Sequence, residues 1–232
     1  MHVPAIAELE LLLIDEIRRT HAVHTLVLYG SHARGDATAE SDLDVAGFSD
    51  DVAVTKRDAR SFHGVPLDGF VHPTSHADVN KGLDHELLSL LGGRVLLDER
   101  GLAQPLLDAL AACDERGPEP LAASEAQMRR VWAHKMLGRI RRDDLEARYR
   151  RHWLLYQLLE DYFALRVRWY RGPRLALSEL ARTAPAVFMV FERALAPEAS
   201  LEALAELVEV VVHATEGDPG GRVGAVGATA GP

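Results

Sequence analysis

Cysteine is nearly absent from this chain of 232 residues, which contains only Cys113. A disulfide scaffold within one chain is therefore excluded, and the composition fits a reducing compartment, so we expect a cytoplasmic protein. No apolar run reaches the roughly 18 residues that a membrane-spanning helix needs, and we expect no membrane segment. The first residues also lack a basic region that leads into an apolar stretch, so the sequence predicts no signal peptide.

Basic side chains are scarce outside one segment, and the net charge is −9. Residues 1–123 carry 10 basic and 21 acidic side chains, residues 124–174 carry 13 and 6, and residues 175–232 carry 3 and 8. The acidic first half argues against nucleic acid binding by that half alone. The basic middle segment either faces phosphate groups or forms the solvated surface of a helix, and both interpretations stay open.

The first half of the chain has the pattern of a mixed α/β domain. Short apolar runs predict strands, and apolar residues at three- and four-residue spacing predict helices. The expected strands are 24–29, 42–48, 59–62, 66–71 and 94–97, and the expected helices are 6–17, 83–91 and 102–113. The third and fourth strands flank a His63-Gly64 turn and should form a hairpin.

The second half predicts helices only. A linker-like segment, "DERGPEP", precedes them at 114–120. Helices are expected at about 124–142, 144–170 and 176–196, followed by a fourth that Ser200 caps. Pro185 should kink or split the third helix.

These patterns predict an α+β fold, in which a mixed sheet with flanking helices precedes an antiparallel four-helix bundle. The expected boundaries are 1–118 for the first domain and 119–215 for the bundle. Residues 216–232 are rich in Gly, Ala and Pro and predict a flexible tail.

A possible anion site lies where the first strand ends, in "LVLYGSHARG". Gly30 permits close approach of an anion to the backbone, Ser31 adds a hydroxyl, and a short helix that follows would direct free N–H groups at one point. A P-loop is excluded because Asp36 and Ala37 stand where Lys and Ser/Thr are required. Arg34 either adds a fixed positive charge or clamps the acidic loop that follows.

A possible cation site comes on the next strand, in "SDLD". Asp42 and Asp44 are two residues apart and therefore share one face of a strand. Two carboxylates about 4–5 Å apart repel each other by roughly 3–4 kcal/mol at an effective dielectric constant of 20. A divalent cation would relieve that repulsion, and Mg²⁺ binds in this way through a few carboxylates and substrate phosphates.

Together, "GSHARG" and "SDLD" resemble the signature of the DNA polymerase beta-like nucleotidyltransferase superfamily. The resemblance covers residues from about 20 to 112 and includes "GGRVLLDERG". The helical half, with "LLEDYFALRVRWYRGPR", is similar to bundles of the aminoglycoside nucleotidyltransferase-like branch and of HEPN-type proteins.

The resemblance implies roles for individual residues. Gly30 and Ser31 would hold the β- and γ-phosphates of a nucleoside triphosphate, and Asp42 and Asp44 would bind two Mg²⁺ ions. A third carboxylate is expected from a neighbouring strand. Asp68 is the preferred candidate, because it follows the hairpin turn inside an apolar run; its rivals are Asp50, Asp51 and Asp58.

The bundle contributes further candidates. Arg174 is a candidate contact to the triphosphate. Glu160 and Asp161 are the bundle carboxylates best placed to meet a cationic acceptor. Arg148 precedes His152 by four residues, which departs from the Arg-x₄₋₆-His motif of HEPN ribonucleases and argues against RNA cleavage.

We therefore expect an Mg²⁺-dependent nucleotidyltransferase that transfers AMP from ATP, or another nucleotide, to a hydroxyl of a small molecule or protein. The alternative is an antitoxin-like regulatory module that binds a nucleotide or toxin with little turnover. A glycosyltransferase also uses Asp-x-Asp but gives no reason for Gly30-Ser31. No template nucleic acid is expected, since no DNA-binding module is evident, and a homodimer is compatible with the sequence.

Overall fold

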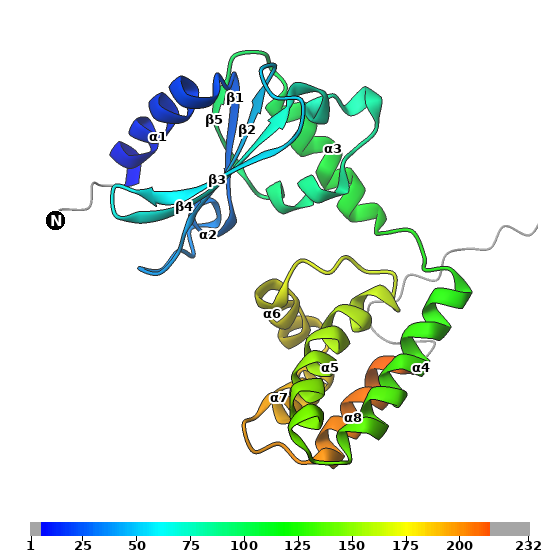
Figure 1. Ribbon diagram of the computed structural model, residues 1–232. Helices are drawn as coiled ribbons and strands as arrows, with labels where there is room; N and C mark the ends of the chain where they lie inside the picture. Colours follow the sequence, from blue (N-terminus) through cyan, green and yellow to red (C-terminus); the bar gives the residue numbers. More distant parts are fainter. Residues whose placement is uncertain (1–5, 214–232) are drawn as a thin grey trace, which may run out of the picture. The chain divides into compact units, whose positions relative to one another are not determined.

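The computed structural model describes residues 6–213, and the chain divides into two compact units, Met1–Arg116 and Gly117–Pro232 (Figure 1). The predicted tail at 216–232 lies outside the described residues. Over the described part of the chain, no helix has the length and apolar character needed to cross a membrane.

The first unit is built on a five-stranded mixed sheet with the order β3-β4-β2-β1-β5. The β2 and β4 strands pair in parallel, and the other pairs are antiparallel. The strands are β1 (Thr25–Tyr29), β2 (Leu43–Ser49), β3 (Lys56–Phe62), β4 (Val65–Pro73) and β5 (Arg94–Asp98). The predicted hairpin is confirmed: β3 and β4 are joined at His63 and Gly64, which both have positive φ, as a tight hairpin turn requires.

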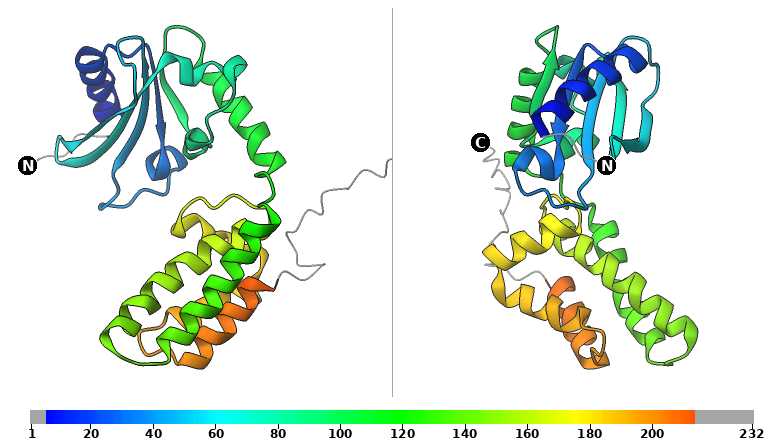
Figure 2. Two further views of the ribbon diagram at one scale, coloured as in Figure 1. Left: turned by 45° about the vertical axis from the view of Figure 1, so that its right-hand side comes forward. Right: turned by 90° about the vertical axis from the view of Figure 1, so that its left-hand side faces the viewer.

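Helices α1 and α3 lie on opposite sides of this sheet (Figures 1 and 2). The helical elements of the unit are α1 (Ile6–His21), α2 (Gly30–Arg34), α3 (Ala103–Arg116), η1 (Thr74–Ala77), η2 (Val79–Lys81) and η3 (His85–Leu90). The expected α-helix at 83–91 is instead the 3₁₀-helix η3, which Asp84 caps by accepting a hydrogen bond from the Glu86 N–H.

Side chains alternate between the two faces along each strand, and this alternation sets the face on which the candidate site residues lie. Leu28 and Val45 are register partners, and both are buried in the core that α1 covers. Tyr29 and Asp44, one position away, must point to the other face. The apolar packing of α1 therefore fixes the face on which the aspartate of β2 stands.

The second unit contains five described helices rather than the four predicted. They are α4 (Ala123–Ile140), α5 (Leu145–Ala164), α6 (Pro173–Thr183), α7 (Pro185–Leu195) and α8 (Leu201–Val212). The third predicted helix is split because Pro185 lacks an N–H and begins α7, after Ala184 leaves helical geometry at φ −144° and ψ 63°. The Ser200 cap is confirmed, since its hydroxyl accepts a hydrogen bond from the Ala203 N–H at 3.2 Å.

The prediction that α5 reaches residue 170 is wrong, because α5 ends at Ala164. Val167 has a positive φ of 56°, which interrupts the helix. The Arg166 guanidinium lies over the Tyr162 ring and donates hydrogen bonds to the carbonyl oxygens of Val210 and Val211 at the end of α8. This buried contact with α8 replaces the last turns of the predicted helix.

Candidate active site

Strand pairing brings Asp44 and Asp68 together at one end of the sheet. Asp44 lies in β2, and its register partners are Tyr29 in β1 and Asp68 in β4. Paired residues point to the same face, and neighbouring strands are about 4.8 Å apart. Asp42 immediately precedes β2 and has the same parity as Asp44. Three of the predicted acidic site residues therefore lie in one region.

The turn that follows β1 contacts this region directly. Gly30 has a positive φ of 69°, and a Cβ atom placed on it would lie 2.0 Å from Oδ2 of Asp44. A side chain fits there only if the Asp44 carboxylate moves away, so contact as well as conformation favours glycine. Ser31 is buried in the first turn of the short helix α2. The predicted phosphate turn and the predicted metal ligand are thus in contact.

Within residues 6–213, no described hydrogen bond or ion pair engages the Asp44 carboxylate. Burial, followed by the charges of Asp42 and Asp68, raises the pKa of Asp44 to about 6, against the opposing effects of Arg34 and His32. Burial, followed by the charges of Asp44 and Asp68, also raises the pKa of the Tyr29 hydroxyl, against the opposing effect of Arg57. Crowded carboxylates of this kind favour a bound cation or proton.

Asp68 differs from Asp44 because it has a cationic partner. Arg57 in β3 donates from Nε to Oδ1 at 2.7 Å and from a terminal nitrogen to Oδ2 at 2.9 Å. Its guanidinium also lies 5.6 Å from the centre of the Phe70 ring. The sequence analysis missed Arg57, although the two-residue hairpin fixes a register in which Arg57 lies diagonally across from Asp68.

The rival third carboxylates lie elsewhere. Asp58 contacts His21 and Arg60. It is adjacent to Arg57 in β3, so its side chain points to the opposite face of the sheet. Asp50 and Asp51 follow the opposite end of β2. Of the four candidates, only Asp68 is a register partner of Asp44.

Two arginines, Arg34 and Arg174, were predicted to contact phosphate groups. Arg34 ends α2 and lies 3.4 Å from a carboxylate oxygen of Asp36, so it contacts the loop as well as acting on Asp44. Arg174 lies at the beginning of α6 in the second unit, and its contact with a triphosphate stays a prediction.

The acidic residues of this region fit a metal ion as a carboxylate pair that is completed by substrate phosphates. Over residues 6–213, no group of three or more His, Cys, Asp or Glu side chains is arranged to hold a metal. Both oxygens of Asp68 accept hydrogen bonds from Arg57. Asp42 and Asp44 remain as a carboxylate pair, and Mg²⁺ commonly binds one or two carboxylates plus substrate phosphates. That pair, beside the Gly30 turn, suits such a mode.

Comparisons with known proteins identify the domain that carries this site. A crystal structure of a nucleotidyltransferase-like protein from Exiguobacterium sibiricum 255-15 is 12% identical, with 90% of this chain and 73% of that chain covered and a TM-score of 0.38. None of the curated proteins matches this chain. Residues 12–70, which include Gly30, Asp44 and Asp68, match the family model described as the nucleotidyltransferase domain. Residues 12–70 of the first unit therefore match a nucleotidyltransferase domain, which supports the resemblance of this unit to the DNA polymerase beta-like superfamily.

Proposed function

We propose that this protein transfers a nucleotide, AMP from ATP, to a hydroxyl of a small molecule or protein and releases pyrophosphate. The observation that carries the proposal is the contact between the Gly30 turn and Asp44, because it joins a backbone turn suited to an anion to a carboxylate that no described hydrogen bond or ion pair engages. A triphosphate with its divalent cation presents both complementary charges. No other ligand class explains both halves of the arrangement as directly.

Each residue has a role in this proposal. The backbone at Gly30 and the Ser31 hydroxyl would hold the β- and γ-phosphates, and Arg34 would add positive charge beside them. Asp42 and Asp44, with Asp68 as the third ligand, would hold two Mg²⁺ ions. When bound, these ions would neutralise the triphosphate and lower the pKa of the acceptor hydroxyl.

The transfer itself is a displacement at phosphorus. The acceptor oxygen forms a bond to the α-phosphorus, and the bond from the α-phosphorus to the bridging oxygen of pyrophosphate breaks. Asp68 would either ligate the first metal ion or receive the hydroxyl proton, and either role requires that Arg57 no longer engage both its oxygens. Positioning and charge stabilisation would supply most of the rate enhancement.

The test is nucleotide transfer by the full chain and by an Asp42→Asn/Asp44→Asn variant. Labelled ATP, CTP, GTP and UTP are each incubated with Mg²⁺ and a metabolite and protein extract from the source cells, and pyrophosphate release and label transfer are followed. We expect the variant to lose at least 1,000-fold in rate, on the order of what removal of essential charge stabilisation causes. Asp50→Asn, at the other end of β2, is the matched control and should retain activity. Equal transfer by the double variant would refute the proposal.

A second candidate function is a binding module with little turnover, and the Arg57–Asp68 ion pair is the observation that favours it. An arginine on the third carboxylate can substitute for the charge of a metal ion. Affinity capture from the source cells, with and without ATP and Mg²⁺, distinguishes the two functions. A stoichiometric partner together with no pyrophosphate release from any triphosphate would favour binding.

A further inference from the structure

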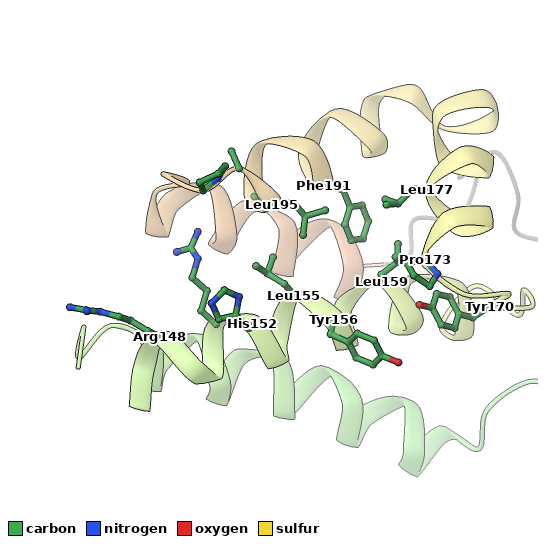
Figure 3. A pocket seen from close by; sticks show the side chains of 14 residues that line it. Arg148, His152, Leu155, Tyr156, Leu159, Tyr170, Pro173, Leu177, Phe191 and Leu195 are labelled. Carbon is green, nitrogen blue, oxygen red and sulfur yellow. The ribbon is translucent and has the colours of Figure 1, made fainter. Parts of the chain in front are cut away.

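A groove in the second unit is lined by residues that belong to none of the candidate site positions of the first unit. It has a volume of about 540 Å³, within the range of roughly 300–1,000 Å³ typical of small-molecule sites. Helices α5, α6 and α7 form its walls (Figure 3). The buried side chains of Leu159, Phe191 and Ala194 line it together with the partly buried Leu155 and Leu177. The body of the groove is therefore apolar.

One end of the groove is basic. Arg148, Arg151 and His152 line it, and the lining includes no acidic side chain. Figure 3 shows Arg148 and His152 near the same end of α5, with Arg148 extending away from the apolar body. The groove thus combines an apolar body with positive charge at a single end.

The basic side chains are only partly engaged by the described residues. One terminal nitrogen of Arg151 donates to the Ala199 carbonyl at 2.7 Å, which holds this guanidinium in place. Arg148 is 3.9 Å from the highly exposed Asp143 carboxylate, a weak contact. No described hydrogen bond or ion pair engages His152. These donors can therefore serve an external anion, and arginine is suited to carboxylate and phosphate groups.

The other end of the groove differs in chemistry. Tyr156 and Tyr170 lie there, each with an aromatic ring and a hydroxyl (Figure 3). Arg148 and Leu159 are eleven residues apart on α5, so the groove follows the helix for about 16 Å. An elongated ligand would thus meet cations at one end and aromatic rings at the other.

We propose that this groove binds an amphipathic anion, with its carboxylate or phosphate head at Arg151 and His152 and its hydrocarbon chain along Leu155, Leu177 and Phe191. Charge complementarity selects the anionic head, and the apolar body selects the chain. A free inorganic anion would leave the apolar walls uncovered, and a cationic amphiphile would meet like charge. The proposal is independent of nucleotide transfer.

The test is calorimetric titration of the full chain with four ten-carbon probes, below the concentrations at which they form micelles. We expect decanoate or decyl phosphate to bind once per chain, decanol to bind at least tenfold more weakly, and decylammonium not to bind. The tighter of the two anions identifies the head group. Inorganic phosphate that binds as tightly as decyl phosphate, or decylammonium that binds as tightly as decanoate, would overturn the proposal.

Variants locate the binding. Leu195→Glu places a negative charge on an exposed lining position and should weaken anion binding at least tenfold. Arg148→Gln/His152→Gln should weaken it about tenfold while leaving the Arg151–Ala199 contact intact. Arg182→Gln, an exposed arginine of α6 outside the lining, is the control and should bind normally. Unchanged affinity in both groove variants, with thermal melting showing that they fold, would place the ligand elsewhere.

Discussion

The two ends of strand β2 both carry aspartates, yet their carboxylates behave in opposite ways. At the start of β2, burial and neighbouring aspartates raise the pKa of Asp44 to about 6. Just beyond its end, hydrogen bonds from Arg100 and Thr74 lower the pKa of Asp50 to about 2. Among the described residues, none donates a hydrogen bond to Asp44, whereas Thr74 and Arg100 both donate to Asp50.

At the same end of the sheet as Asp50, the aspartate of β5, Asp98, also accepts hydrogen bonds. Burial alone would raise the pKa of Asp98, but hydrogen bonds from the N–H groups of Ala103 and Leu102 and from the Thr25 hydroxyl outweigh it and lower that pKa. Asp98 thereby satisfies the first turn of α3. Acidic residues are thus frequent at both ends of the sheet, and the donors around each carboxylate distinguish a structural aspartate from a candidate for metal binding.

Among the single substitutions, the largest effect is expected from Gly30→Ala. The new Cβ would lie 2.0 Å from Oδ2 of Asp44, and since that atom ends a flexible side chain, the carboxylate should be displaced while the fold persists. We expect nucleotide transfer to fall at least 100-fold, on the scale of a misplaced catalytic group.

Gly35→Ala is the matched control for that variant. Gly35 also has a positive φ, 78°, but a Cβ there would meet nothing within 4 Å. Both variants should lose about 1 kcal/mol of stability from backbone strain, but only Gly30→Ala should lose activity. If Gly30→Ala and Gly35→Ala lost activity equally, contact with Asp44 would not be the reason that Gly30 is needed.

Asp98→Ala tests the end of the sheet at which Asp50 and Asp98 accept hydrogen bonds. Its loss leaves the N–H groups of Leu102 and Ala103 without their acceptor, so the free energy of unfolding at pH 7 should fall by about 1–2 kcal/mol. Because the native pKa is lowered, the stabilisation exists above the unfolded value of 3.8 and disappears as the pH falls through the native pKa. Calorimetric unfolding of both proteins at pH 7 and pH 3 measures this, and a constant difference would contradict it.

Asp44→Asn should change the free energy of unfolding in the opposite direction to Asp98→Ala. The native pKa of about 6 exceeds the unfolded value of 3.8, so folding without metal becomes less favourable as the pH rises from about 4 to about 6. The asparagine variant should therefore be more stable than the natural protein at pH 7 by on the order of 1 kcal/mol. The gain should vanish at pH 4. Calorimetry in the presence of a chelator is the measurement, and a destabilised variant at pH 7 would show that Asp44 is satisfied after all.

Arg57→Gln is expected to have the smallest effect. It would release both oxygens of Asp68, so Mg²⁺ should bind about two- to five-fold more tightly, whereas stability should change by less than about 1 kcal/mol because the ion pair is exposed. Titration calorimetry with Mg²⁺ measures the affinity. Arg100→Gln removes the equivalent partner from Asp50 and should leave Mg²⁺ binding unchanged. Weaker Mg²⁺ binding in Arg57→Gln would indicate that the arginine positions Asp68 for the metal.

Much of the first unit could be predicted because its signals are local. All five strands were predicted, and the His63-Gly64 turn predicted the β3–β4 pair, although β3 begins at Lys56, three residues before the predicted start at 59. The shared face of Asp42 and Asp44 also follows from strand periodicity alone. The 3₁₀ geometry of η3 could not be predicted, since apolar spacing does not separate it from an α-helix.

Errors in the second unit have long-range causes. The early end of α5 depends on Arg166 meeting carbonyl groups of α8, some 44 residues later in the chain. Pro185 is local, and the sequence did indicate a break there. The choice between a kink and two helices depended on the backbone of Ala184.

The sequence by itself determined the residues available for chemistry: a glycine turn after one strand and two aspartates on one face of the next. The tertiary structure decided that Asp68 is the partner of Asp44, that Gly30 lies against its carboxylate and that Arg57 engages the third acid. Local periodicity encodes the direction of a side chain. The charges and donors that surround it come from strands distant in sequence, and these set whether an aspartate is satisfied or poised for a ligand.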